Sequence, residues 1–358
     1  MSVSVSRATY NEVVKYIYGV VVPLIVIFGL FGNIMTFKVL RRISSKSSTT
    51  CLLYALTAAD SLYMVTTAVS DAFILANRIK PREVTNIRIR YLLPMETIGW
   101  SLPSYISNWI VVMISLERTI AVLSPMKSKK IWTKRTSLIA IVLACMVPTL
   151  STSPRWVQAR GVPVINNITN ETDYKMELYF VPGMDIKFYG ILKLINTYML
   201  YVGPVCVVFI CNICIIVGLY VNRRQMQLHV TGDRQRRENK VSRMVLLICV
   251  HFCICVIPNS AVVTYNVSTR STQHYRDTFI ELLIKVFYVL LVWNSAMNFL
   301  VYVMSSVAFR KEFLRILCGV FRRRKTATSM TRSVTKTDVT NATNVSNDCD
   351  QLTDLRYM

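Results

Sequence analysis

The sequence predicts an all-α membrane protein, a seven-transmembrane helix bundle followed by a C-terminal amphipathic membrane-surface helix. The chain of 358 residues is 53% hydrophobic and only 17% charged, whereas soluble proteins carry about a quarter charged residues. Its apolar residues form seven blocks that are long enough to cross a bilayer, which takes about 20 residues each. Because lipid offers the backbone no hydrogen bonds, each block is predicted to be a helix.

The seven blocks follow one another along the chain with polar segments between them. They cover residues 16–40, 50–77, 92–124, 132–153, 189–221, 241–267 and 279–307. Residues 1–15 are predicted to form a short extracellular N-terminus. This segment is polar and the first block is long, so the sequence does not predict a cleavable signal peptide.

Basic residues predict the orientation of the bundle, because Lys and Arg concentrate in cytoplasmic loops. The connections after the first, third, fifth and seventh blocks are rich in Lys and Arg. This places the N-terminus outside in a multi-pass protein of the plasma membrane, although the basic loop 78–90 then lies outside as well. Sequons at Asn167 and Asn170, in the connection after the fourth block, favour the same orientation, since glycosylation occurs on the lumenal side.

The segment that follows the seventh block is predicted to be an amphipathic helix over residues 308–320. Its apolar face includes Phe309, Phe313 and Ile316, and it is too polar to span the bilayer. Cys318 lies at its end, where palmitoylation would anchor it. The remaining residues, 321–358, are rich in Ser, Thr and Asn and are predicted to form a disordered cytoplasmic tail with phosphorylation sites.

The overall charge and the cysteine and histidine positions exclude several other classes of protein. The net charge of +23 comes from loops, because almost no basic residue falls inside the apolar blocks, so we do not expect nucleic-acid binding. The ten cysteines offer no pair in the loops predicted to lie outside, and hence no disulfide framework. His229, His251 and His274 are scattered, so we expect neither a metal cluster nor an enzyme.

Polar residues inside the blocks are the first functional candidates, because burying them is costly unless they have partners. Asp60 lies midway through the second block with no Lys or Arg at a similar depth. Ser107 in the third block, with Asn294 and Asn298 in the seventh, could supply further oxygens. Together these four residues predict a site for a small hard cation, Na⁺, acting as an allosteric ion. The simpler alternative is hydrogen bonding between helices, which we favour for Asn33.

Proline residues interrupt two of the predicted helices. Pro204 in the fifth block and Pro258 in the sixth each remove a backbone hydrogen bond and should kink the helix. Such a kink can serve as a hinge or can be a static packing feature, and the sequence alone leaves both open.

Several short motifs occur in order, one for each expected helix. They are Gly32-Asn33, LTAAD ending at Asp60, ERT at 117–119, CVIP at 255–258 and NFLVY at 298–302. Together they resemble the signatures of class A (rhodopsin-like) G-protein-coupled receptors over nearly the whole chain. Pro204 matches the fifth-helix proline of that family, and Phe252 matches the aromatic residue one turn from the CWxP segment. The resemblance makes Asp60 the sodium-site carboxylate.

The sequence departs from the family pattern at positions that matter for activation. Val256 replaces the tryptophan of CWxP, and Phe299 replaces the proline of NPxxY. Thr119 stands for the usual tyrosine, Asn212 for the fifth-helix tyrosine and Leu93 for the third-helix disulfide cysteine. We therefore expect outer loops without the family disulfide and a switch that does not depend on an indole at position 256.

The resemblance also implies roles at the inner end of the bundle. In the resting state Arg118 would pair with Glu117 and with Glu238 on helix six, and Tyr302 would take part in activation. Breaking the Arg118–Glu238 contact would let helix six swing outward and open a groove for a heterotrimeric G protein. The tail would then bind a receptor kinase and arrestin.

The resemblance further suggests the kind of ligand. The amine receptors of the family have an aspartate at the position of Trp100, and opsins have their retinal lysine at the position of Val292, so neither ligand fits. The pocket is predicted to include Trp100, Ser104, Asn259, Ser260 and Tyr288. The sequence is most similar in character to invertebrate neuropeptide receptors of the FMRFamide-receptor-like kind. A chemosensory small-molecule receptor, or less favoured a transporter or channel, remains an alternative.

Overall fold

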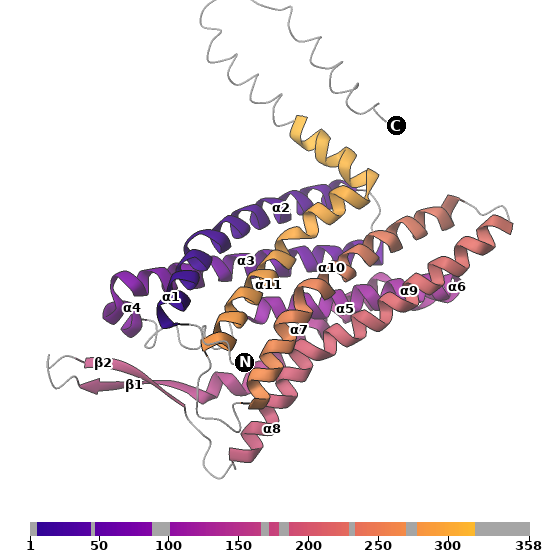
Figure 1. Ribbon diagram of the computed structural model, residues 1–358. Coiled ribbons are helices and arrows are strands. Elements are labelled where there is room, and N and C mark those ends of the chain that lie inside the picture. Colours follow the sequence, from indigo (N-terminus) through magenta and orange to yellow (C-terminus); the bar gives the residue numbers. More distant parts are fainter. Residues whose placement is uncertain are drawn as a thin grey trace, which may run out of the picture.

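The computed structural model describes residues 6–43, 47–87, 101–165, 172–178, 186–228, 233–269 and 278–318, with the side chains of some stretches, including 222–238, outside the description. Seven of its helices are long and apolar enough to cross a membrane. They run side by side as an elongated bundle (Figure 1). The predicted fold class, a multi-pass seven-helix membrane protein, is confirmed.

The first span is longer than predicted. It consists of α1 (Arg7–Tyr16), a π-helical turn (Ile17–Val21) and α2 (Val22–Arg42), which together form one span of 36 residues. Helix formation begins at Arg7 because the Ser6 side chain caps α1 by accepting a hydrogen bond of 3.1 Å from the Thr9 amide. Most of the polar segment 1–15 is therefore the first part of this helix and not a separate extension.

The second to fourth spans begin at capped or proline-marked positions. The elements are α3 (Ser48–Ile79), α4 (Pro81–Ile87), α5 (Leu102–Leu123), α6 (Pro125–Ile131) and α7 (Lys134–Gln158). The prediction placed the start of the third span at residue 92, but α5 begins at Leu102. Pro103 lies in its first turn, a position where proline favours a helix start.

A two-stranded hairpin follows the fourth span and was not predicted. Strand β1 (Ala159–Ile165) pairs antiparallel with β2 (Thr172–Leu178). The amide of Tyr174 in β2 donates to the side chain of Asn86 in α4 at 2.9 Å, which joins the hairpin to the end of the second span. We call this end of the bundle the hairpin end. Asn167 and Asn170 fall between the strands, outside the described residues.

Two of the last three spans contain the prolines that were predicted to kink them. The elements are α8 (Ile186–Thr197), a π-helical turn (Tyr198–Val202), α9 (Gly203–Leu228), α10 (Asp233–Thr269) and α11 (Thr278–Ser305), followed by a helix over residues 307–318. Pro204 is the second residue of α9, just after the π-helical turn, and Pro258 lies inside the 37-residue α10. A wide π turn or a proline is a known cause of a bend in a helix.

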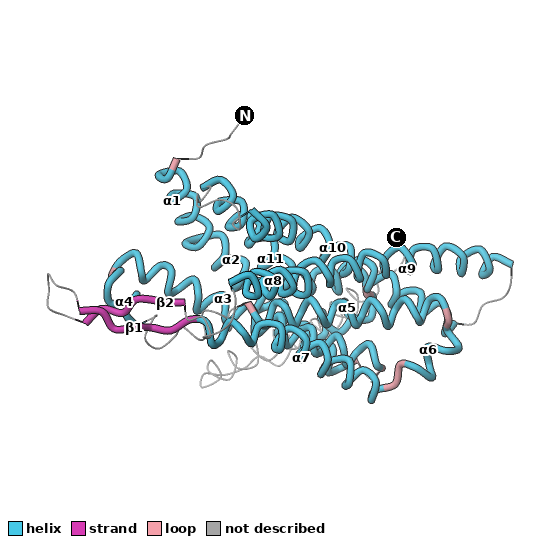
Figure 2. The backbone as a smooth tube through the Cα atoms, turned by 90° about the horizontal axis from the view of Figure 1, so that it is seen from below, coloured by secondary structure: helices cyan, strands magenta, loops and turns pink. Residues whose placement is uncertain are grey.

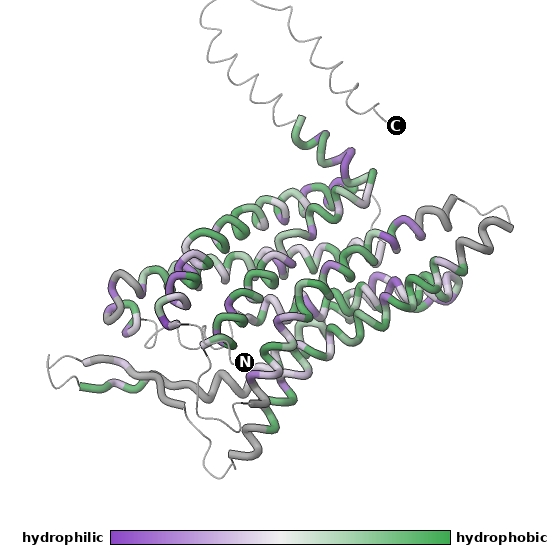
Figure 3. The backbone as a smooth tube through the Cα atoms, in the orientation of Figure 1, coloured by the Kyte–Doolittle hydropathy of each residue, from purple (hydrophilic) through white to green (hydrophobic). Residues whose placement is uncertain are grey.

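The arrangement of the helices gives the bundle a continuous core. Helix α5 contacts α3, α7, α9 and α10, and α11 packs between α2 and α10. Apart from the hairpin, the described chain is almost entirely helical (Figure 2), and long hydrophobic stretches run along helices such as α2 (Figure 3). Many of these apolar side chains, for example Leu24, Ile27 and Phe209, face outward, as a lipid environment requires.

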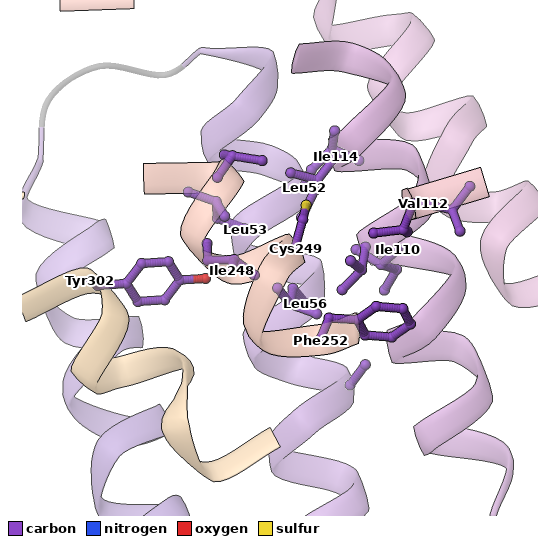
Figure 4. Close-up of a cluster of buried hydrophobic side chains, with 14 of the residues drawn as sticks. Leu52, Leu53, Leu56, Ile110, Val112, Ile114, Ile248, Cys249, Phe252 and Tyr302 are labelled. Atoms are coloured by element: carbon purple, nitrogen blue, oxygen red, sulfur yellow. The ribbon is translucent and has the colours of Figure 1, made fainter. Parts of the chain in front are cut away.

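The main cluster of buried apolar side chains joins α3, α5, α10 and α11 (Figure 4). Leu56, Ile110, Ile248 and Phe252 are fully or almost fully inaccessible within it. A second cluster lies nearer the hairpin end and joins the first span to α3 and α11. The core therefore joins α10 to α3 and α5 in the middle of the bundle.

Candidate functional site

A buried carboxylate marks the middle of the bundle. Asp60 on α3 is fully inaccessible. The Ser107 hydroxyl of α5 donates to its Oδ1 at 2.7 Å, and the Asn298 amide of α11 donates to its Oδ2 at 2.7 Å. The Ser295 hydroxyl lies near the same carboxylate. Asp60 thus connects three helices through hydrogen bonds, which stabilise its charged form.

The predicted sodium site is only partly reproduced by this arrangement. The structure brings Asp60, Ser107 and Asn298 together, but the described contacts of the carboxylate do not include Asn294, although that side chain is buried on the same helix. Ser295, the next residue, takes its place. The carboxylate and two hydroxyl oxygens suit a small hard cation. Prediction missed Ser295 because one residue changes the direction of a side chain by about 100° on a helix.

A second buried polar group lies at the opposite end of the bundle from the hairpin, which we call the Arg118 end. Arg118 Nη2 donates to Glu117 Oε1 at 2.9 Å, with side-chain exposures of 6% and 1%. The hydroxyls of Ser48 and Thr49 donate to the same Oε1 at 2.6 and 2.8 Å. Arg118 Nη2 also donates to Thr49 Oγ1 at 2.5 Å. The two charges therefore pair with each other and with the start of α3.

The position of Glu117 has an electrostatic cause that the sequence did not reveal. Ser48 and Thr49 are the first residues of α3, and the N-terminus of a helix carries partial positive charge. The carboxylate is therefore stabilised by a cation, two hydroxyls and a helix dipole. Its partner Arg118 has a buried position with good hydrogen bonds, which offset part of the cost of desolvation.

The predicted contact between Arg118 and Glu238 falls outside the described side chains. The backbone of Glu238 lies in α10, but its side chain is not described, so the contact stays a prediction. The described partners of Arg118 are Glu117 and Thr49.

A large cavity opens beside Arg118. Its volume is about 1190 Å³. Its lining comes from α2, α3, α5, α6, α10, α11 and the helix over 307–318, and includes Thr49, Glu117, Arg118, Trp132, Lys240, Met244, Tyr302, Phe309 and Lys311. The Tyr302 hydroxyl has no hydrogen-bond partner among the described residues and lies at this cavity. The predicted activation residues Glu117, Arg118 and Tyr302 thus line one space.

Helix α10 is held against α5 by packing and by a polar contact between Ser115 and Cys249. Phe252 and Val256 are fully inaccessible. The Ser115 hydroxyl of α5 lies 3.0 Å from the Cys249 thiol of α10. A valine at 256 fills the core without an indole, so the ring nearest this region on α10 is Phe252, one turn away. Pro258 lies inside the helix beyond Val256, between this anchor and the hairpin end.

Phe299 forms an aromatic cluster that joins three elements. Its ring lies 5.2 Å from Phe313 and 6.1 Å from Phe309 of the 307–318 helix, centroid to centroid, and 6.3 Å from Phe31 of α2. A Cβ added at Gly32 would lie 2.8 Å from the Phe299 Cβ. Gly32 is therefore needed for the close approach of α2 and α11. Cys318, the predicted palmitoylation site, ends this surface helix and is partly buried.

The predicted ligand pocket belongs to the hairpin end. Ser104 on α5 and Asn259 and Ser260 on α10 are buried, and Tyr288 on α11 is partly buried. Trp100 lies outside the described residues. The Ser260 hydroxyl has no partner among the described residues, whereas Tyr105 and Tyr201 bring their hydroxyls to 2.6 Å across α5 and the π turn. Tyr105 and Tyr201 had no sequence signal, because tyrosine is common at both ends of membrane helices.

Comparison with known proteins settles the family. The family model described as "7 transmembrane receptor (rhodopsin family)" matches residues 32–302, which is more than half of the chain. The chain belongs to the rhodopsin family of seven-transmembrane receptors. The resemblance inferred from the motifs at Asp60, Arg118 and Tyr302 is thereby confirmed.

Relatives of this receptor cover most of its length at low identity. F59B2.13 of Caenorhabditis elegans, assigned to the G-protein coupled receptors, is 26% identical over 94% of this chain and 80% of its own. Somatostatin receptor type 1 of Rattus norvegicus is 22% identical over 85% and 71%, and the allatostatin-A receptor of Bombyx mori is 23% identical over 86% and 82%. Receptors named for peptides thus align with most of this chain.

Proposed function

We propose that this receptor binds an extracellular peptide and activates a heterotrimeric G protein at its Arg118 end. The observation that carries the proposal is the cavity of about 1190 Å³ with Arg118 and Tyr302 in its wall. It is bordered by α3, α5, α10 and the surface helix, and it is large enough to receive part of a partner protein. The Arg118 end is then cytoplasmic, and the N-terminus and hairpin face outward from the plasma membrane.

The likeness to somatostatin and allatostatin-A receptors supports a peptide as the ligand. The residue at position 100 also favours a peptide over an amine, because this sequence has Trp100 where the amine receptors of the family have an aspartate. The buried polar residues Ser104, Asn259 and Ser260 would offer hydrogen bonds to a peptide backbone. Within the peptide receptors, the FMRFamide-like kind stays our preferred subfamily.

Outward movement of α10 would transmit the signal. Lys240, Val241 and Met244 of α10 line the cavity, so a displacement of this helix end would widen it. The Ser115–Cys249 contact and the packing of Phe252 hold α10 in the closed position. A ligand that binds better to the open form shifts the population toward it. Pro204 and Pro258 are the proposed hinges.

The test is ligand-evoked G-protein activation in cells that express the receptor, screened over peptide pools. We expect an active peptide whose response is lost in Arg118→Ala. Arg135→Ala is the matched control, because Arg135 is exposed in the first turn of α7 and is not part of the cavity lining. Uptake or current without G-protein dependence, or equal responses of both variants, would overturn the proposal.

Two accompanying roles are proposed at the polar centres. Na⁺ would be held by Asp60 with Ser107 and Ser295, and Asp60→Asn should remove the effect of Na⁺ on agonist affinity.

Glu238→Ala should raise ligand-free signalling if Glu238 restrains Arg118. Unchanged basal activity at equal surface expression would count against that restraint. Palmitoylation at Cys318, glycosylation at Asn167 and Asn170, and arrestin and receptor-kinase binding at the tail stay predictions.

A further inference from the structure

A buried carboxylate at the hairpin end has no hydrogen-bond donor. Asp71 on α3 is 3% exposed, and neither of its carboxylate oxygens has a hydrogen-bond partner among the described residues. Asp60 and Glu117, the other two carboxylates that are buried among the described residues, each accept at least two hydrogen bonds, although Glu117 Oε2 accepts none. Most buried polar groups in proteins have a hydrogen-bond partner, so a carboxylate with neither oxygen partnered indicates a donor that the described residues do not supply.

The nearest cation does not fill this need. Lys285 on α11 interacts electrostatically with Asp71, but the two form no ion pair. The Lys285 ammonium instead lies over the ring of Tyr18, 5.6 Å from its centroid. It also interacts with Glu281 one turn away, which in turn lies 3.9 Å from Arg7 of α1. In a structural ion pair the Lys285 ammonium would contact the Asp71 carboxylate, and here it does not.

Two tyrosines, Tyr18 and Tyr288, lie near the same carboxylate. Asp71 is within electrostatic range of Tyr18 and Tyr288, whose rings lie 5.9 Å apart at 33°. Tyr63 is buried in the same cluster. The face of a tyrosine ring attracts a cation. A carboxylate with two unpartnered oxygens near two tyrosines is therefore suited to a planar guanidinium, which can donate to both oxygens at once.

We propose that Asp71, with Tyr18 and Tyr288, binds an arginine side chain of the peptide ligand. The proposal rests on the function proposed above and names the charge that the ligand presents. Asp71 on α3 then supplies a carboxylate for the ligand. The amine receptors of the family have theirs at position 100, where this sequence has a tryptophan. The guanidinium would displace the Lys285 ammonium from the face of Tyr18, because both cations are attracted to the same ring and to Asp71.

The test measures binding without signalling. The purified full-length receptor is heated with N-acetyl-arginine amide or with N-acetyl-citrulline amide, which has nearly the same shape and no charge. We expect the arginine probe, at ten times its Kd, to raise Tm by about 2–4 °C. The citrulline probe should have no effect. The arginine effect should disappear in Asp71→Asn and grow in Lys285→Met, which removes the competing cation.

Glu83→Gln is the matched control, since Glu83 is an exposed carboxylate of α4 at the same end of the bundle. It should keep the full arginine effect. Equal shifts with both probes, or an arginine shift that survives Asp71→Asn, would overturn the proposal. If Asp71→Asn does not fold, the Lys285→Met result still decides, because a site without Asp71 would not gain affinity from the loss of Lys285.

A signalling experiment separates this site from the proposed function. Active peptides from the pools are remade with citrulline in place of arginine and tested on the wild type and Asp71→Asn. A large loss of potency for the citrulline peptide on the wild type, and none on the variant, supports the site. If the arginine probe binds at Asp71 but no peptide activates a G protein, the proposed function fails and the site stands. If citrulline peptides signal as well as arginine peptides, the site fails and the receptor function stands.

Discussion

The two ends of the bundle treat buried charge differently. At the Arg118 end, Glu117 accepts hydrogen bonds from Ser48, Thr49 and Arg118 within one chain. At the hairpin end, Asp71 has no described donor. At the Arg118 end one oxygen of the carboxylate, Glu117 Oε1, has three donors, whereas Glu117 Oε2 has none among the described residues. The hairpin end has an unmet requirement, which is what a site completed by its ligand should show.

The largest expected effect comes from removing one carboxylate at each end. Glu117→Ala leaves the Arg118 guanidinium buried without its counter-charge and should lower the free energy of unfolding by about 3–5 kcal/mol. Asp71→Ala removes no hydrogen bond and should change it by less than about 1 kcal/mol. Thermal unfolding of both purified variants without ligand checks this. Equal losses would show that the two ends do not differ.

A second test concerns how tightly the helices pack at each end. Gly32→Ala forces a Cβ to within 2.8 Å of the Phe299 Cβ, and such overpacking should cost about 1–3 kcal/mol. Gly19→Ala is the control in the first span, because its added Cβ meets only Leu75 at 4.0 Å. Gly19→Ala should leave Tm unchanged or raise it. A similar loss in both variants would mean that close approach at Gly32 is not the cause.

The smallest expected effect separates basal signalling from ligand response. Ser115→Ala removes the contact with Cys249 that holds α10 to α5. A loss of about 1 kcal/mol should raise ligand-free G-protein activation by up to about fivefold at equal surface expression. Tyr105→Phe removes the contact with Tyr201 at the other end and should change peptide potency, with basal activity unaffected. The reverse pattern would contradict the division between the two ends.

The sequence predicted most of the fold, because length and hydropathy decide which segments can span a bilayer. It also grouped Asp60, Ser107 and Asn298, because all three are polar residues inside apolar blocks. It did not predict the role of Ser48 and Thr49, which lie just before the predicted start of the second block at residue 50. Which hydroxyl faces the bundle depends on the residue where α3 begins, and the Ser47 cap sets that start by accepting from the Thr50 amide.

Asp71 and the hairpin escaped prediction for different reasons. Asp71 stands near the end of an apolar block, where a polar residue usually faces headgroups or water. The predicted block already extends to residue 77, and only the packing of α3 against the other helices shows that Asp71 is buried. The hairpin follows α7 directly, and its strands of seven residues are too short for periodicity to stand out.

Phe299 affects how α11 can bend and how it is joined to the surface helix over 307–318. No proline interrupts α11, so its backbone hydrogen bonds continue through Phe299 to its end. The Phe299 ring also packs against Phe309 and Phe313 of the 307–318 helix. The apolar face of such an amphipathic helix is expected to lie in the headgroup layer of the membrane. We therefore expect a tilt of α11 to raise or lower that helix relative to the lipid. Bilayer thickness and lateral pressure would then influence the receptor through α11, whose backbone hydrogen bonds a proline would have interrupted.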